Sequence, residues 1–171
     1  CFLSMDVETA VYPKSIAEEL KSRNYIIDPD PVLAQRDREA FFRETMKSLA
    51  VREKLTIDWI RDKDWDLFHM HIMETDRINH FFFDGYDTPG SEYYSKVREF
   101  YRAVDSFIRA VRTALQPDDQ FIMLSDHGFI RLCEEVNLNH FLEKLGYLKF
   151  SSEKTPGVLP VSPESLAYSM S

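Results

Sequence analysis

One stretch of the chain organises the rest, and it reads Trp65-Asp66-Leu67-Phe68-His69-Met70-His71-Ile72-Met73-Glu74-Thr75-Asp76-Arg77-Ile78-Asn79-His80. Its apolar residues, Leu67, Phe68, Met70, Ile72 and Met73, are too continuous for a strand with one solvent-exposed face, and they favour a strand covered on both sides, as in a parallel sheet. Its second half predicts a helical turn, on which Asp76 and His80 share one face because they are four residues apart. The pair therefore follows the carboxyl end of a predicted strand, where open α/β sheets bind their ligands.

A second stretch repeats this pattern and reads Gln120-Phe121-Ile122-Met123-Leu124-Ser125-Asp126-His127-Gly128-Phe129. Alone, an Asp-x-x-x-His pair is more often a solvated helix face or a local hydrogen bond than a site. Here two apolar runs each end in an Asp and a His, in a chain with only 5 histidines. The recurrence favours a common site for Asp76, His80, Asp126 and His127.

These residues resemble the metal-binding core of the type I phosphodiesterase/nucleotide pyrophosphatase family, within the alkaline phosphatase superfamily. The resemblance implies that Asp76 and His80 bind one metal ion, and that Asp126 and His127 help to bind a second. It implies zinc first, with manganese as the alternative, because carboxylate and imidazole ligands suit either ion better than magnesium. Glu74 and Thr75 are expected to orient these ligands through hydrogen bonds.

The resemblance also implies an alkaline phosphatase-like α/β fold, incomplete in this chain, with a largely parallel sheet flanked by helices. We expect residues 1–171 to form a single α/β domain fragment. Within it, residues 1–36 are a cap or insertion, residues 37–150 are the metal-site core, and residues 151–171 are a mobile loop and truncated end. The family's Thr or Ser nucleophile has no counterpart here, so the catalytic residue lies outside this chain and the fragment alone is expected to be inactive.

Three further segments predict helices from the spacing of their apolar residues. Residues 37–62 and 91–115 carry apolar stripes at helical spacing. Residues 137–145 form a short helix with Asn137 as its N-cap and Gly146 as its stop. Residues 81–83 are three phenylalanines, which either belong to the core or line an apolar pocket for the leaving group.

The composition excludes some classes of partner. The formal net charge of −8 argues against non-specific nucleic-acid binding, because there is no basic excess to displace counterions. It does not argue against a phosphate-ester substrate, because bound divalent ions reverse the local charge of a site. The chain has no run of 18 apolar residues, so the sequence predicts no membrane-spanning segment in it.

The sequence allows two interpretations for some residues near the predicted ligands. Arg77 either contacts a phosphate or faces solvent on its helix. His69 and His71 alternate along the predicted strand and are interpreted as hydrogen-bonded core residues rather than ligands. Cys133 is interpreted as a small apolar filler.

The sequence thus predicts part of a two-metal hydrolase that cleaves phosphodiester or pyrophosphate bonds through a Thr or Ser nucleophile. One alternative is a non-catalytic α/β binding module, in which the Asp and His residues only cap strands and helices. The other is a different branch of the superfamily, phosphoglycerate mutase-like or sulfatase-like.

Overall fold

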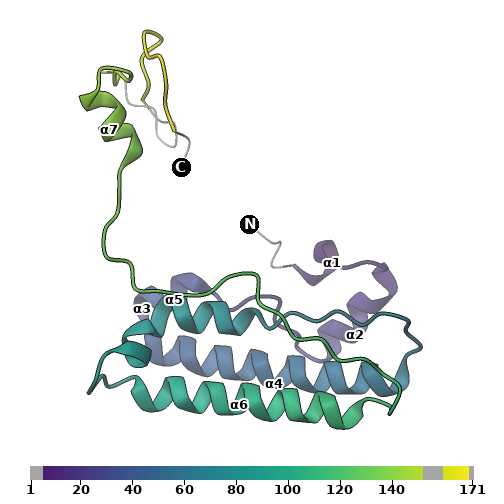
Figure 1. Cartoon of the computed structure of the whole chain (residues 1–171). Coiled ribbons are helices and arrows are strands. Elements are labelled where there is room, and N and C mark those ends of the chain that lie inside the picture. Colours follow the sequence, from purple (N-terminus) through teal and green to yellow (C-terminus); the bar gives the residue numbers. More distant parts are fainter. Residues whose placement is uncertain (1–5, 152–159, 170–171) are drawn as a thin grey trace. The chain divides into compact units, whose positions relative to one another are not determined.

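The computed structural model describes residues 6–151 and 160–169, and most of its ordered elements are helices (Figure 1). The chain divides into two compact units, Cys1–Phe129 and Ile130–Ser171, and each is described by itself. The elements in chain order are α1 Val7–Ala10, η1 Lys14–Ile16, α2 Ala17–Ser22, α3 Pro31–Arg36, α4 Arg38–Asp62, α5 Met73–Asp87, α6 Tyr94–Ala114 and α7 Leu138–Lys144.

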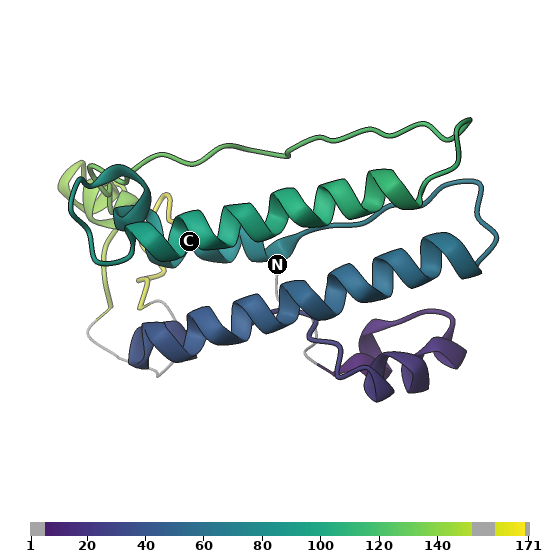
Figure 2. The same cartoon turned by 90° about the horizontal axis from the view of Figure 1, so that it is seen from below.

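In the first unit, α4, α5 and α6 lie side by side and enclose the core (Figures 1 and 2). The largest core side chains are fully buried aromatic rings from all three helices: Phe41, Phe82, Phe100 and Phe107. The helices predicted over residues 37–62 and 91–115 are confirmed. The core interpretation of residues 81–83 holds for Phe82, which is 0% exposed, while Phe81 packs against the core from its edge.

The long helix α4 begins where the sequence supplies a cap. Asp37 has extended backbone geometry and its Oδ1 accepts a hydrogen bond from the Ala40 amide at 2.8 Å. Such a cap satisfies one of the amides that a helix start leaves unpaired.

The predicted parallel sheet is wrong. Over residues 6–151 and 160–169 there is no β-strand, and the only strand-like pairing is an isolated antiparallel bridge between Phe150 and Val161. The apolar runs are extended but unpaired. Side-chain alternation orients a segment toward a core, but a strand also needs a neighbour to take its backbone hydrogen bonds, and no such neighbour is present among the described residues.

Two extended segments replace the predicted strands, residues 63–72 and 116–129. Both start at the end of the bundle where α4 and α6 stop, and both run back along it in the same direction (Figures 1 and 2). Each segment therefore leads back toward α5, although the two segments do not pair as strands of a sheet.

The second unit contains α7, which begins at the predicted cap: Asn137 Oδ1 accepts a hydrogen bond from the His140 amide at 2.9 Å. Gly146 follows the helix with a positive φ of 79°, which favours glycine. Asn139 bonds to the Ser169 backbone in both directions, at 2.8 and 2.7 Å. Of the mobile loop and end predicted for residues 151–171, residues 152–159 and 170–171 lie outside the described residues.

Three predictions of buried side chains are wrong. His69, His71 and Cys133 are exposed rather than buried, because they lie on segments that have one covered face or none. Within the described part of the chain, no helix is both long and apolar enough to cross a membrane.

Candidate metal centre

The first half of the candidate centre lies on α5, which is anchored by a buried ion pair. Glu74 is 0% exposed and both its oxygens accept hydrogen bonds from Arg52 Nε of α4, at 3.0 and 3.1 Å. Ser48 donates a further hydrogen bond to Glu74 at 2.6 Å. Arg52 also bonds to Tyr25, whose pKa is raised by burial. The network fixes the first turn of α5, because removing either partner would leave a buried charge unpaired.

This anchor places the residues that follow. Thr75 Oγ1 donates to the Ile72 carbonyl at 2.8 Å, across the start of the helix. Glu74 and Thr75 therefore hold the backbone that carries Asp76. Their side chains bond to Arg52, Ser48 and the Ile72 carbonyl rather than to Asp76 or His80. One turn later, Asn79 Nδ2 bonds to Tyr101 Oη of α6 at 3.0 Å. Burial is the main reason that the pKa of Tyr101 is raised.

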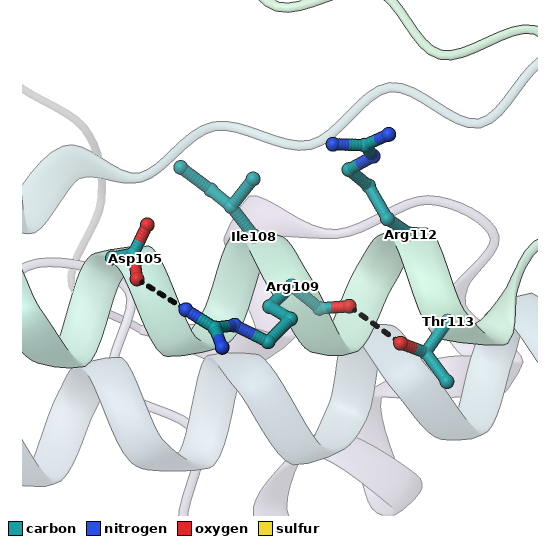
Figure 3. A pocket seen from close by; sticks show the side chains of 5 residues that line it. All are labelled: Asp105, Ile108, Arg109, Arg112 and Thr113. Carbon is teal, nitrogen blue, oxygen red and sulfur yellow. Dashed lines mark hydrogen bonds and ion pairs between the residues drawn. The ribbon is translucent and has the colours of Figure 1, made fainter.

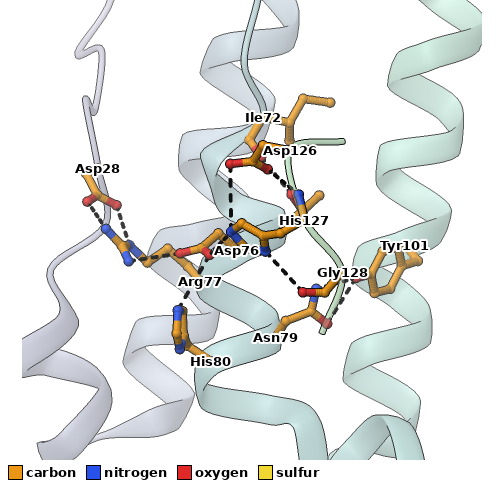
Figure 4. A network of polar contacts seen from close by, with 11 residues as sticks. Asp28, Ile72, Asp76, Arg77, Asn79, His80, Tyr101, Asp126, His127 and Gly128 are labelled. Atoms are coloured by element: carbon orange, nitrogen blue, oxygen red, sulfur yellow. Dashed lines mark hydrogen bonds and ion pairs between the residues drawn. The ribbon is translucent and has the colours of Figure 1, made fainter. Parts of the chain in front are cut away.

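Asp76 is the point at which the two predicted halves meet (Figure 4). Its Oδ1 lies 3.5 Å from His80 Nε2 on the same helix and 3.9 Å from His127 Nε2 on the second extended segment. The Asp76 side chain is 22% exposed, while both His side chains are 55% exposed. One carboxylate oxygen thus faces two accessible imidazoles from separate parts of the chain.

The second half is held mainly by its own backbone. Asp126 Oδ1 accepts a hydrogen bond from the His127 amide at 3.1 Å, and its Oδ2 lies 3.7 Å from His127 Nε2. His127 Nδ1 lies 3.0 Å from the Gly128 carbonyl, and Ser125 Oγ donates to the His127 carbonyl at 2.6 Å. If Nδ1 carries the proton, Nε2 has the lone pair that a metal ion needs.

Phe129 joins the two halves. Its ring packs edge-on against His80, with centroids 4.9 Å apart, and lies 5.4 Å from the His127 ring. Aromatic contacts of this kind restrict both imidazoles on one side. Sequence reasoning missed Phe129, although its position directly after Asp-His-Gly was the available signal.

A partly buried Arg–Asp pair borders the centre on its other side. Arg77 Nε donates to Asp28 Oδ1 at 2.7 Å and its Nη2 bonds to Asp28 Oδ2, while its Nη1 donates to Asp76 Oδ2 at 3.1 Å. The hydrogen bonds to Asp28 are the main cause of the raised pKa of Arg77. Arg77 is therefore not the solvent-facing residue of the second interpretation, because its side chain is 20% exposed and paired with Asp28. Its contact with a phosphate stays a prediction. Asp28 was also missed, since the sequence shows it only as the end of a short apolar run.

Each Asp–His pair has a spacing that suits two ligands of one metal ion. Two ligands of a tetrahedral zinc ion, with bonds of about 2.1 Å, lie about 3.4 Å apart. The distances of 3.5 and 3.7 Å within the Asp76–His80 and Asp126–His127 pairs are close to that spacing and too long for good hydrogen bonds. In the described part of the chain, no three His, Cys, Asp or Glu side chains converge closely enough to hold an ion as they stand.

The surface hollows elsewhere do not compete with this centre. One lies on α6 and is lined by Asp105, Ile108, Arg109, Arg112 and Thr113 (Figure 3). Arg109 is paired there with Asp105 at 3.0 Å. None of the predicted site residues lines this hollow, which contains no imidazole.

Comparison with known proteins gives one result that covers almost the whole chain. No curated protein and no solved structure matches it significantly. The sequence model of one family, described as type I phosphodiesterase / nucleotide pyrophosphatase, matches residues 5–168. This family comprises hydrolases of the phosphodiesterase and pyrophosphatase type, which act on phosphate esters and are usually metal-dependent. The chain therefore belongs to the type I phosphodiesterase / nucleotide pyrophosphatase family.

Proposed function

We propose that this chain carries the metal-ligand core of a two-metal phosphoesterase that hydrolyses phosphodiester or pyrophosphate bonds. Asp76 and His80 are ligands of one ion, and Asp126 and His127 are ligands of the second. The observation that carries the proposal is the position of Asp76 Oδ1, 3.5 Å from His80 Nε2 and 3.9 Å from His127 Nε2. Asp76 of α5 and His127 of an extended segment are 51 positions apart in the sequence, and both belong to this arrangement.

The charge balance explains why such a centre needs cations. The chain has a formal net charge of −8, and two carboxylates lie at the centre itself. Without cations this charge would repel a phosphate ester. When bound, divalent ions supply neutralisation of the phosphoryl oxygens and activation of a nucleophile near neutral pH. The exposed imidazoles of His80 and His127 leave the centre open to a substrate.

The chain's own residues orient the ligands. Arg77 donates to Asp76 Oδ2, so Oδ1 is the oxygen left to face the histidines. The Gly128 carbonyl contacts His127 Nδ1 and so favours the tautomer with a lone pair on Nε2. Glu74 and Thr75 act one step further away by fixing the start of α5. These contacts hold the donors in place before an ion arrives.

We assign no nucleophile among these residues. The two hydroxyl groups beside the ligands, those of Thr75 and Ser125, both donate to backbone carbonyls. The proposal therefore assigns the attack to a Thr or Ser other than Thr75 and Ser125. Zinc is the ion we expect first, and manganese is the alternative.

Metal binding tests the proposal without requiring turnover. Cobalt(II) is titrated into the chain and followed by its visible absorption, and zinc and manganese are then measured by calorimetry. We expect Asp76→Ala and His127→Ala each to weaken binding by at least about tenfold, because a centre with few protein ligands tolerates no loss.

A matched control is available in the second unit. His140 Nδ1 lies 3.2 Å from Glu143 Oε2, so this is also an exposed His–carboxylate pair on a helix. His140→Ala is expected to leave metal affinity unchanged. Equal binding by all three variants would mean that the Asp–His pairs are caps, as in a non-catalytic binding module.

A further inference from the structure

We propose that Asp28 is a positioning residue for the metal centre. It holds Arg77 so that only one oxygen of Asp76 is hydrogen-bonded, while the other faces His80 and His127. The inference rests on the proposed function, because it assigns Asp28 a role toward the same metal ligands. It adds a residue from the N-terminal part of the chain, which the sequence marked only as a cap or insertion.

The geometry of the guanidinium carries the first step. An arginine offers two adjacent donors along its Nε and Nη2 edge, which match a carboxylate. Asp28 takes both donors of that edge, so Arg77 has only Nη1 directed at Asp76. Without Asp28, the same edge could turn to Asp76 and occupy both oxygens. Asp28 therefore preserves Asp76 Oδ1 as a metal ligand.

The charges carry the second step. Arg77 is a full positive charge with Nη1 3.1 Å from Asp76 Oδ2, and at that range it opposes a divalent cation on the same carboxylate. Asp28 is only 8% exposed and pairs directly with Arg77, so the two charges cancel where water screens poorly. Asp28, Arg77 and Asp76 together carry a net charge of −1, which is the charge of Asp76 alone.

The backbone around Asp28 is itself fixed on both sides. Arg52 Nη2 donates to the Ile26 and Ile27 carbonyls at 3.3 and 3.2 Å. Asp30, two residues after Asp28, caps α3 by accepting a hydrogen bond from the Val32 amide at 2.9 Å. Pro29 between them is fully buried. The same Arg52 that anchors the first turn of α5 thus holds the backbone directly before Asp28.

The test replaces the charge while keeping the shape. Asp28→Asn is expected to weaken cobalt(II) and zinc binding by about tenfold to a hundredfold, the usual effect of losing a group that orients a ligand. Asp58→Asn is the matched control, since Asp58 pairs with Arg23 in the same unit but away from the candidate centre. Its metal affinity should equal that of the unchanged chain.

A second substitution separates positioning from a general structural role. If Arg77 causes the loss once Asp28 is neutral, then Asp28→Asn with Arg77→Met should bind metal more tightly than Asp28→Asn alone. A merely structural pair would give the opposite sign, because a second disruption adds to the first. Asp28→Glu, which keeps the charge, should bind metal as the unchanged chain does. It also carries the test if Asp28→Asn fails to fold, since weak binding by a folded Asp28→Glu would overturn the inference.

The outcomes distinguish this inference from the proposed function. Asp76→Ala losing metal while Asp28→Asn binds normally would overturn the role of Asp28 and leave the metal centre standing. Normal binding by Asp76→Ala would overturn both. Loss in Asp28→Asn together with recovery in the double variant supports the inference.

Discussion

Residues 65–72 and residues 120–128 have the same kind of sequence and very different surroundings. In the first segment, Phe68, Met70 and Ile72 are half-buried against the helices, while Leu67 on the other face is 85% exposed. In the second segment every residue is exposed, including Ile122 at 77%. Apolar continuity alone therefore did not decide burial.

The difference extends to the candidate ligands that follow each segment. The first leads directly into α5, whose Glu74 is buried and whose Asp76 is bonded to Arg77. The second ends in Asp126, whose side chain is 75% exposed and bonded mainly within its own turn. We infer that the first half of the centre is rigidly built, and that the second half depends on its contacts with the first.

The largest expected effect comes from removing the anchor of the first half. Glu74→Ala leaves Arg52 buried without its partner and should lower the free energy of unfolding by about 3–5 kcal/mol. Urea unfolding of the metal-free chain measures this. Asp126→Ala, an exposed carboxylate, should change it by less than about 0.5 kcal/mol. Similar losses in both variants would remove the contrast between the two halves.

Adjacent residues test the covered face of the first segment. Phe68→Ala should cost about 1–2 kcal/mol, less than the roughly 3–5 kcal/mol of a fully buried phenylalanine, because its ring is covered on one side only. Leu67→Ala and Ile122→Ala should each cost less than about 0.5 kcal/mol. Thermal unfolding of the three variants compares them. A large cost at Ile122 would show that the second segment is also packed.

Phe129 tests whether the second half depends on the first. Phe129→Ala removes the contacts to His80 and His127 and should weaken metal binding about twofold to tenfold, since an aromatic contact contributes ~0.5–1.5 kcal/mol. Phe141→Ala, an exposed phenylalanine of the second unit, is the control. Unchanged binding in both variants would mean that the second segment reaches the centre without Phe129.

The smallest expected effect is on stability in acid, through Glu19, which contacts Trp59 near the C-terminal end of α4. The pKa of Glu19 is lowered from 4.5, first by the hydrogen bond from Trp59 Nε1 at 2.9 Å. The folded state therefore binds fewer protons than the unfolded state, so this contribution is present above pH 4.5 and is lost as the pH falls through the folded pKa. Glu19→Gln should flatten the fall of stability in acid, as measured by urea unfolding between about pH 5 and 3. An identical pH dependence in both proteins would contradict this.

The helices and caps were readable because they depend on neighbours in sequence. The stripe of α6 and the cap at Asn137 both involve residues within a few positions of one another. The same holds for the Asp76–His80 pair, which shares a helix face by spacing alone. The sequence by itself therefore determined these elements and pointed to the residues of the candidate centre.

Only the tertiary structure decided the partners of those residues. The predicted sheet failed because strand pairing is a contact between distant segments, which apolar periodicity does not encode. Asp28 and Phe129 joined the centre for the same reason, since their contacts with Arg77 and His80 link positions far apart in the chain. Local hydrogen bonds and residue spacing can be predicted from neighbouring residues, whereas contacts between distant segments form only once the helices have packed.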